Sequence, residues 1–365
     1  MPTKHLTETP AKPSTRQNVI SRRALRVLMM AAVLWPPSIQ IVQAQTTDLP
    51  RIWISSPPVT DYMTLFTDPT SWATGLAHVQ VLKLSTFFVS HTGNKGLEKI
   101  ILFTQAHHIK LALEAGMLTP GPNECGKGVE GYSLPGFMLG IARRIQQLGG
   151  SIDIIAMDEP YYFGHVATSF WRPSRGVCRA PIPLVAQNVA RTIAAVRTVF
   201  PDVEVGDIEP IPNYAKISAA DDPRIPQLAD WASAFAQATG RPLSFMHFDI
   251  GWITQPPLVD AQAEQNGWIS TLLRATIVIR KIDLPYGIII NGRPDATSNI
   301  AWTESAEQHF KIIERRLRLQ PNDMIFQSWV KFPDRVGPET IPGTLTNLLA
   351  TYVRWYESQA ARVAR

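Results

Sequence analysis

Two adjacent carboxylic acids close a short apolar segment near the middle of the chain. Residues 151–160 read Ser-Ile-Asp-Ile-Ile-Ala-Met-Asp-Glu-Pro, and the isoleucine-rich run predicts a buried strand. Pro160 cannot donate a hydrogen bond to a sheet, so the strand must end at Asp158 and Glu159. Two acids at such a strand end repel each other, and partial burial raises at least one pKa, which is how a general acid is made.

The elements that must position these acids alternate between strand and helix from residue 50 onward. The predicted strands are residues 51–58, 78–89, 110–117, 152–158, 203–208, 243–250, 286–291 and 324–330. The predicted helices are residues 96–108, 136–148, 184–199, 225–238, 259–282, 303–317 and 344–357, although residues 276–279 also fit a strand. This order indicates parallel βαβ units, and eight of them over residues 50–358 predict an α/β protein, a single (β/α)8 TIM barrel. A doubly wound sheet is the alternative, but no G-x-G-x-x-G motif follows the first strand.

In such a barrel the carboxyl ends of all strands meet at one face, and polar and aromatic side chains gather at these ends. Carboxylates and amides mixed with tryptophans are typical of sugar binding, because indoles stack on sugar faces and hydroxyls need directed hydrogen bonds. Besides Asp158 and Glu159, the candidates are Glu209, His247, Asp249, Trp252, Asn291, Arg293 and Trp329.

Met157-Asp158-Glu159-Pro160 resembles the Asn-Glu-Pro signature that ends strand four in a large clan of TIM-barrel glycoside hydrolases. The resemblance implies that Glu159 is the general acid/base and that Asp158 replaces the asparagine that binds a sugar hydroxyl. Trp329 resembles the strand-eight tryptophan that floors the reacting sugar subsite in that clan. The similarity covers the barrel pattern, but its specific matches are few and short.

The chain departs from the clan where the nucleophilic Glu should end strand seven, because Asn291 stands there. An amide can neither form a glycosyl ester nor ionise, so Asp249 or Glu209 is the expected partner carboxylate. A separation from Glu159 of about 5–5.5 Å would imply retention, and one of roughly 6.5–9.5 Å inversion. Assistance by an acetamido group of the substrate is a further alternative.

The N-terminal segment predicts export. A basic region with Arg22, Arg23 and Arg26 precedes an apolar stretch, and Ala44 closes a sequence that resembles a cleavage site. Residues 1–44 therefore read as a signal peptide, and residues 21–25 resemble a twin-arginine motif. The apolar stretch is too short to span a bilayer, and we expect a periplasmic or secreted protein.

Charge and cysteine content narrow the function classes. The formal charge of +5 arises in residues 1–44, so the rest of the chain is neutral, and no nucleic-acid partner is expected. The two cysteines, Cys125 and Cys178, follow strands three and four and predict a disulfide across adjacent loops.

The sequence as a whole predicts an exported glycoside hydrolase that acts on a polysaccharide or oligosaccharide and requires no cofactor. One alternative is a carbohydrate-binding barrel without catalysis, which serves polysaccharide export or modification. Another is a metal-dependent hydrolase built on His247 and Asp249, although no third ligand with matching spacing is evident.

Overall fold

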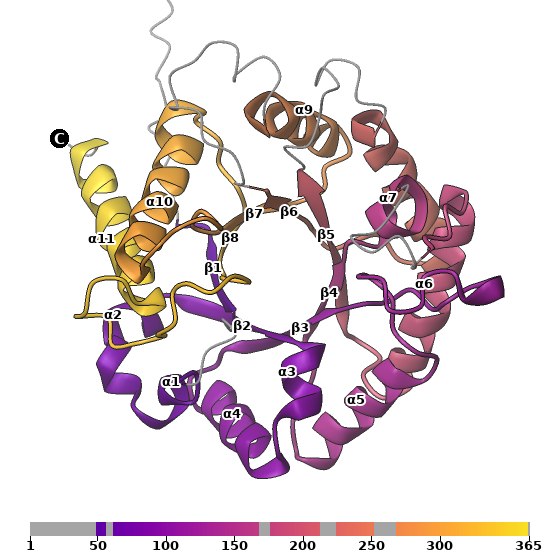
Figure 1. Ribbon diagram of the computed structural model, residues 1–365, viewed down its shortest axis with the longest axis horizontal. Coiled ribbons are helices and arrows are strands. Elements are labelled where there is room, and N and C mark those ends of the chain that lie inside the picture. Colours follow the sequence, from indigo (N-terminus) through magenta and orange to yellow (C-terminus); the bar gives the residue numbers. More distant parts are fainter. Residues whose placement is uncertain (1–48, 56–60, 168–175, 212–223, 252–267, 364–365) are drawn as a thin grey trace, which may run out of the picture. The chain divides into compact units, whose positions relative to one another are not determined.

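A closed barrel of parallel strands forms the centre of the protein. The computed structural model describes residues 49–55, 61–167, 176–211, 224–251 and 268–363. Within these residues each strand pairs with the next in sequence, and β1 pairs with β8 to close the ring (Figure 1). The strands are β1 (Arg51–Ser55), β2 (Val79–Ser85), β3 (Lys110–Ala115), β4 (Ile154–Asp158), β5 (Glu204–Ile211), β6 (Met246–Ile250), β7 (Tyr286–Ile290) and β8 (Asp323–Phe326). The predicted (β/α)8 barrel is confirmed, and closure of the sheet excludes the doubly wound alternative.

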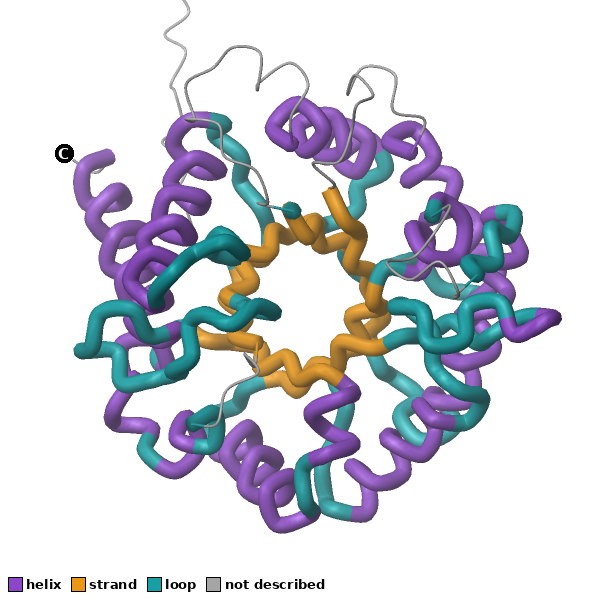
Figure 2. The backbone as a smooth tube through the Cα atoms, in the orientation of Figure 1, coloured by secondary structure: helices purple, strands orange, loops and turns teal. Residues whose placement is uncertain are grey.

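Helices surround the barrel on its outer side (Figure 2). The α-helices are α1 (Thr64–Thr67), α2 (Ala73–Leu76), α3 (Thr86–His91), α4 (Asn94–Ala106), α5 (Phe137–Gln147), α6 (Ile182–Arg197), α7 (Arg224–Thr239), α9 (Trp268–Lys281), α10 (Asn299–Lys311) and α11 (Leu345–Val363). Shorter helical segments are η1 (Pro69–Trp72), η2 (Pro122–Glu124), η3 (Tyr162–Val166) and η5 (Ile312–Arg316). Within the described residues, no helix combines the length and the apolar character needed to cross a bilayer.

The structure corrects the extent of one predicted strand and excludes the strand alternative within one predicted helix. The second strand ends at Ser85, whose hydroxyl accepts the backbone N–H of Phe88 at 3.1 Å and so caps α3. Residues 276–279 lie in α9, where Leu272, Ala275 and Ile279 are buried at helical spacing. In both places, a cap or a buried helical face outweighed the β preference of the branched side chains.

The barrel interior is filled by alternate residues of its strands. Nine apolar side chains form one buried cluster inside the ring: Trp53, Val81, Ala112, Ile154, Ala156, Ile208, Phe245, Ile289 and Ile325. Gly206 makes room for this filling, because a Cβ there would stand 2.2 Å from the Phe245 ring. The residues two positions after Val81, Ala112, Ala156, Ile289 and Ile325 therefore point into the carboxyl end of the barrel.

A buried polar network closes the opposite, amino-terminal end of the barrel. Asp323 accepts hydrogen bonds from Arg51 Nε at 2.6 Å and from Trp53 Nε1 at 3.0 Å. His247 Nε2 lies 3.0 Å from Asp323 Oδ2, and its ring stacks on Phe245. Burial alone would raise the pKa of Asp323, but the hydrogen bonds from His247 and Arg51 hold that pKa well below its ordinary value.

The prediction that His247 binds substrate is therefore wrong in its placement. The side chain is fully buried among interior residues beneath the mouth, and burial lowers its pKa despite the opposing Asp323 charge. The imidazole of His247 is neutral, and its Nε2–H donates to Asp323 at the amino-terminal end of the barrel. The sequence pattern correctly predicts that His247 points into the barrel. The side chain lies deeper than a substrate-binding residue would, in the layer of side chains below the mouth.

Candidate functional site

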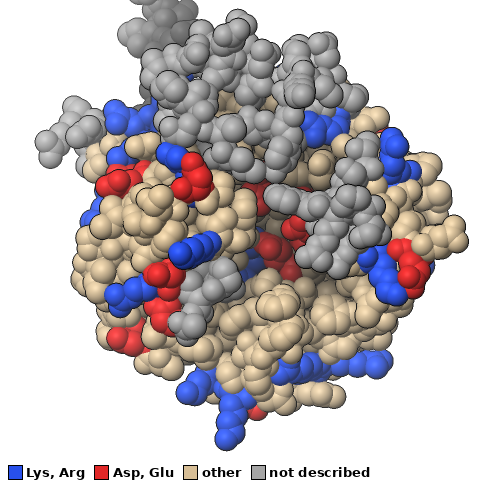
Figure 3. Space-filling view, viewed as in Figure 1, with Lys and Arg blue, Asp and Glu red and all other residues tan. Residues whose placement is uncertain are grey.

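The mouth of the barrel is lined by polar residues that continue the inward-facing rows of the strands. Asp158 follows Ala156 on β4, Asp249 follows His247 on β6, and Asn291 follows Ile289 beyond β7. Gln327 follows Ile325 in the same way beyond β8. Figure 3 shows acidic side chains in the hollow at the centre of this face.

Two further rows bring an ion pair into the mouth. Lys83 on β2 and Glu114 on β3 are adjacent across the sheet and form a salt bridge. The Lys83 side chain is fully buried, whereas Glu114 is partly accessible. The fifth carboxyl group of the mouth belongs to Glu130, which lies on the loop after β3. Among the described residues, the mouth therefore combines the ammonium group of Lys83 with the carboxyl groups of Glu114, Glu130, Asp158, Glu159 and Asp249.

The turn that carries Glu159 is strained. Its backbone N–H still pairs with the Ile208 carbonyl at 3.1 Å, and its carbonyl accepts the N–H of Phe163 at 2.9 Å. Between these bonds the φ angle of Glu159 is 48°, in the left-handed region that disfavours side chains with a Cβ. Such a residue costs about 1–3 kcal/mol and persists only where its surroundings hold it. Strain of this kind is concentrated at functional sites.

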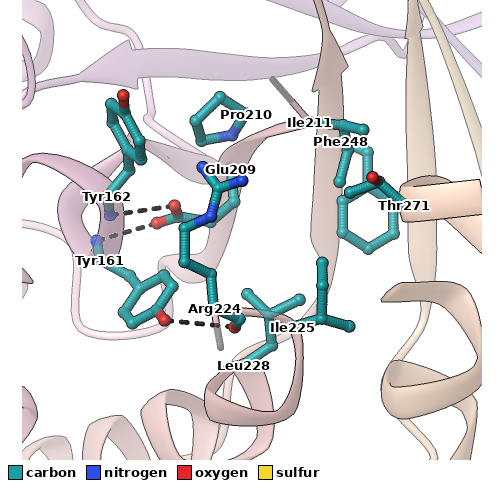
Figure 4. A pocket seen from close by; sticks show the side chains of 10 residues that line it. All are labelled: Tyr161, Tyr162, Glu209, Pro210, Ile211, Arg224, Ile225, Leu228, Phe248 and Thr271. Atoms are coloured by element: carbon teal, nitrogen blue, oxygen red, sulfur yellow. Dashed lines mark hydrogen bonds between the residues drawn. The ribbon is translucent and has the colours of Figure 1, made fainter. Parts of the chain in front are cut away.

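Glu209 holds this turn from behind. Its two carboxyl oxygens accept the backbone N–H groups of Tyr161 at 2.8 Å and Tyr162 at 3.0 Å (Figure 4). Its neighbours Val205 and Ile211 lie in the outer core, so Glu209 points away from the barrel axis. The prediction of Glu209 as partner carboxylate does not fit this position, because the group is buried behind the turn and not across the opening from Glu159.

A second carboxyl group supports Glu209. Asp207 shares a hydrogen bond with Glu209, and Trp231 Nε1 donates to Asp207 Oδ2 at 2.5 Å. Burial raises the pKa of both carboxyl groups well above ordinary values, and the charge of Asp207 raises that of Glu209 further. A proton shared between the two groups allows this pair to remain buried. Glu209 also lines a small cavity with Arg224, Leu228, Phe248 and Thr271 on the outer side of β5 (Figure 4).

The pKa values of Asp158 and Glu159 are both shifted strongly upward. Burial is the largest cause for each. For Glu159 the charges of Asp158 and Asp249 add to the effect of burial. For Asp158 the charges of Glu130 and Glu114 add to it, and Lys83 opposes them. Within the described part of the chain, neither acid forms an ion pair. The upward shifts favour the protonated form of both groups, which is the form that a general acid needs.

Asp249 has a pKa close to neutral pH, so both its protonated and its charged form are populated there. Burial raises its pKa to about 7, with a further contribution from the charge of Glu114 and an opposing one from Lys83. Asn291 Nδ2 donates to Asp249 Oδ1 at 3.2 Å, and a hydrogen bond from Trp329 also favours the charged form. Asn291, at the end of strand seven, thus supports the carboxylate of strand six.

Of the remaining predicted substrate-binding residues, Trp329 lies at the mouth and Arg293 does not. Trp329 is 45% exposed and contacts Asp249, which places an indole at the mouth. Arg293 forms a surface ion pair with Asp295 at 2.6 Å, so its guanidinium is directed to a local partner rather than into the mouth. Trp252 lies outside the described residues.

The predicted disulfide is present. Cys125 and Cys178 are bonded, with their Cα atoms 5.0 Å apart and a sequence separation of 53. The N–H of Gly126 also donates to the Gly176 carbonyl at 2.8 Å, which joins the same two loops. Gly131 of the first loop lies so close to β4 that a Cβ would stand 2.8 Å from the Asp158 carbonyl oxygen. The bridged loops therefore pack directly against the strand end that carries the acids.

Sequence reasoning missed Lys83, Glu114, Glu130 and Gln327 as mouth residues. Three of them follow inward-facing apolar residues by two positions, namely Val81, Ala112 and Ile325. The period-two row inside each strand was the signal that could have found them. Glu130 follows no such row, because it lies on a loop. Across the described segments, no group of three or more His, Cys, Asp or Glu side chains is arranged to hold a metal ion.

Comparison with known proteins gives similarity of fold. No family model matches the chain, and no curated protein sequence matches it. One similar solved structure is a truncated 3-deoxy-D-arabino-heptulosonate 7-phosphate synthase from Thermotoga maritima, with 11% identity and a TM-score of 0.45 over 86% of this chain and 87% of that one. A psychrophilic family 10 endo-β-1,4-xylanase has 10% identity and a TM-score of 0.46 over 82% and 96% of the two chains. A β-glucosidase from Exiguobacterium marinum has 12% identity and a TM-score of 0.39 over 73% and 79%. The assignment as a (β/α)8 barrel rests on the strand topology and not on these similarities.

Proposed function

We propose that this protein is an exported glycoside hydrolase that cleaves a polysaccharide or oligosaccharide by carboxylate catalysis. The observation that supports the proposal most directly is the pair of carboxyl groups, Glu159 and Asp249, at the ends of β4 and β6. The charge of Asp249 contributes to raising the pKa of Glu159, which indicates that the two carboxyl groups share one opening. Two carboxyl groups at one opening, one holding a proton and one ionised, are what acid and base roles require.

In this proposal Glu159 donates a proton to the glycosidic oxygen that leaves. Burial and the charges of Asp158 and Asp249 raise its pKa well above the ordinary value, which favours the protonated form. Proton donation at that oxygen avoids expulsion of an alkoxide, which is the difficult part of the reaction. Asp158 points to the same opening and would bind a sugar hydroxyl.

Asp249 acts as the partner carboxylate. Its charged form is supported by Asn291 Nδ2 and by Trp329, so it can stabilise or attack the sugar carbon as positive charge develops there. Trp329, exposed beside Asp249, would supply a stacking face for the sugar ring.

A second candidate function is a sugar-binding barrel without catalysis. The observation that favours it is Asn291 at the end of strand seven, where it donates a hydrogen bond to Asp249 rather than supplying a carboxylate. A binding protein would be stabilised by its glycan but would release no product.

The experiment that separates the two functions is reducing-end release from a panel of glycans by the mature protein. The hydrolase proposal predicts product from at least one glycan, and loss of product in Asp249→Asn. The matched control is Glu98→Gln, an exposed acid on α4 that should leave the rate unchanged. A glycan that raises the melting temperature of the wild type yet yields no product would instead establish the binding function.

Export is tested separately by N-terminal sequencing of the protein recovered outside the cytoplasm. Cleavage after Ala44 would support the proposal, and recovery of the intact N-terminus from the cytoplasm alone would contradict it.

A further inference from the structure

Among its described residues, the barrel mouth contains more acid than base. Of its five carboxyl groups, Glu114 is neutralised by Lys83, the one cation that the described mouth residues supply. The groups of Glu130, Asp158, Glu159 and Asp249 remain. Their mutual repulsion appears in the pKa values, because the charges of other mouth acids contribute to raising the pKa of each of these four groups.

Two buried amide oxygens at the same mouth have no hydrogen-bond partner among the residues that the structure describes. Asn291 Oδ1 and Gln327 Oε1 are fully enclosed atoms, and the two residues are 2% and 6% exposed. Both occupy inward rows at the ends of the paired strands β7 and β8, and Asn291 also contacts Asp249. A buried acceptor without a donor costs about 1–3 kcal/mol, so such atoms indicate a ligand that supplies donors.

With the hydrolase proposed above as its premise, we infer that the sugar bound at this mouth carries a free amino group, so that the substrate is a glycan containing deacetylated hexosamine. An ammonium group offers three donors and a positive charge. It thereby satisfies the orphaned amide oxygens and neutralises the surplus acid together. A neutral sugar or an acetamido sugar would supply donors but no charge, so the mouth acids would have to keep their protons.

Binding of an ammonium group at this mouth must be linked to protons. The charged and titratable groups that face Asp249 are Glu114, Lys83, Glu130, Asp158 and Glu159, with the Trp329 indole as hydrogen-bond donor. A cation beside Asp249 favours its carboxylate form, so a group that holds its proton half the time at pH 7 releases it on binding. The affinity should therefore rise with pH between about 4.5 and 6, where free Asp249 is mainly protonated and the amino group of the sugar keeps its own proton.

The test is calorimetric titration of Glu159→Gln, which binds glycan without turning it over. The ligands are glucosamine and galactosamine hexasaccharides in α-1,4 and β-1,4 linkage, each beside its fully N-acetylated counterpart and a neutral hexasaccharide of the same linkage. Titration in two buffers of different ionisation enthalpy counts the protons released. CaCl2 and pentalysine are titrated as the other cations that an acidic mouth could bind.

We expect one amino hexasaccharide to bind at least about tenfold more tightly than its N-acetylated counterpart at pH 6, where the amino group is charged, which is the effect of one charge-assisted hydrogen bond. Binding should release a proton, and adding Asp249→Asn should abolish that release and weaken affinity by about tenfold. Glu130 is an exposed loop residue, so Glu130→Gln should weaken binding severalfold without affecting folding. Glu98→Gln should change nothing.

The inference is overturned if neutral or N-acetylated glycans bind as tightly as the amino glycan, or if CaCl2 or pentalysine binds while no amino glycan does. Its failure is distinguishable from failure of the hydrolase proposal. Wild-type cleavage of neutral glycans alone would remove the inference and keep the hydrolase. Tight, proton-linked binding of an amino glycan that is never cleaved would keep the inference and remove the hydrolase.

Discussion

Replacing Asp249 by asparagine should stabilise the protein at neutral and alkaline pH. A pKa raised from 3.8 to about 7 means that ionising this carboxyl group costs free energy in the folded state and not in the unfolded one. At about 1.4 kcal/mol per pKa unit, the cost is about 4 kcal/mol once the group is fully charged. Since Asp249 is partly accessible to water, we expect about 2–4 kcal/mol.

The asparagine keeps the local hydrogen bond, because its side-chain oxygen can still accept from Asn291 Nδ2. The sign of the effect follows from linkage. The folded protein holds the Asp249 proton to higher pH than the unfolded chain does, so wild-type stability falls as pH rises from about 4 to 7 and is level above that range. Asp249→Asn lacks this loss. The two proteins should therefore be equally stable below pH 4 and differ most at pH 8.

The assay is thermal unfolding of wild type, Asp249→Asn and the control Glu98→Gln at pH 4 and pH 8. At about 2 °C per kcal/mol for a chain of this size, the melting temperature of Asp249→Asn should exceed that of wild type by about 4–8 °C at pH 8. An unchanged or lower melting temperature at pH 8, or the same difference at both pH values, would refute the reasoning.

Three further predictions follow from the same geometry. The rate of hydrolysis should increase with pH up to about 7 and then level, because Asp249 acts as its carboxylate; a rate that falls over this range in the pH profile would contradict the assignment. Glu209→Gln should lower the free energy of unfolding by about 1–3 kcal/mol in urea titration, since an amide has only one oxygen for the two N–H groups that Glu209 accepts, whereas unchanged stability would show that the turn is held in another way. Replacing Cys125 and Cys178 by serine should cost up to about 4 kcal/mol for a loop of 53 residues in the same urea titration, and an undiminished midpoint would show that the bridge constrains little.

The fold could be predicted because strand and helix patterns alternate along the whole chain. Apolar runs of strand length are separated by helical periodicity, and this order leaves few topologies. The boundaries were less predictable. Ser85 ends β2 by capping α3, and a cap decides between strand and helix where β-branched residues continue the apolar pattern.

The sequence predicts which side chains point into the barrel, but not how far from the mouth each of them lies. Alternation along β6 places His247 and Asp249 on the same inward face, and the sequence cannot tell which layer of the barrel each occupies. In the structure His247 lies beside Asp323 at the amino-terminal end of the barrel, whereas Asp249 lies at the mouth. The partner of His247, Asp323, lies 76 positions away in sequence, and its contact with His247 depends on closure of the barrel.

Glu209 illustrates a different limit. Its Glu-Pro sequence resembles the end of β4, and the sequence suggested the same role for both. Glu209 remains in the outward row of β5, whereas the left-handed backbone of Glu159 takes that residue out of the strand alternation. A backbone angle of this kind is fixed by contacts from other elements, including the hydrogen bonds of Glu209 itself.

The most direct test of Glu159 as proton donor is the rate of Glu159→Gln on the glycan that the wild type cleaves best. A glutamine has nearly the same shape and cannot release a proton, so the rate should fall by about 10²–10⁴-fold while the affinity for the glycan stays within a factor of about two. Turnover equal to that of wild type and of Glu98→Gln would contradict the assignment.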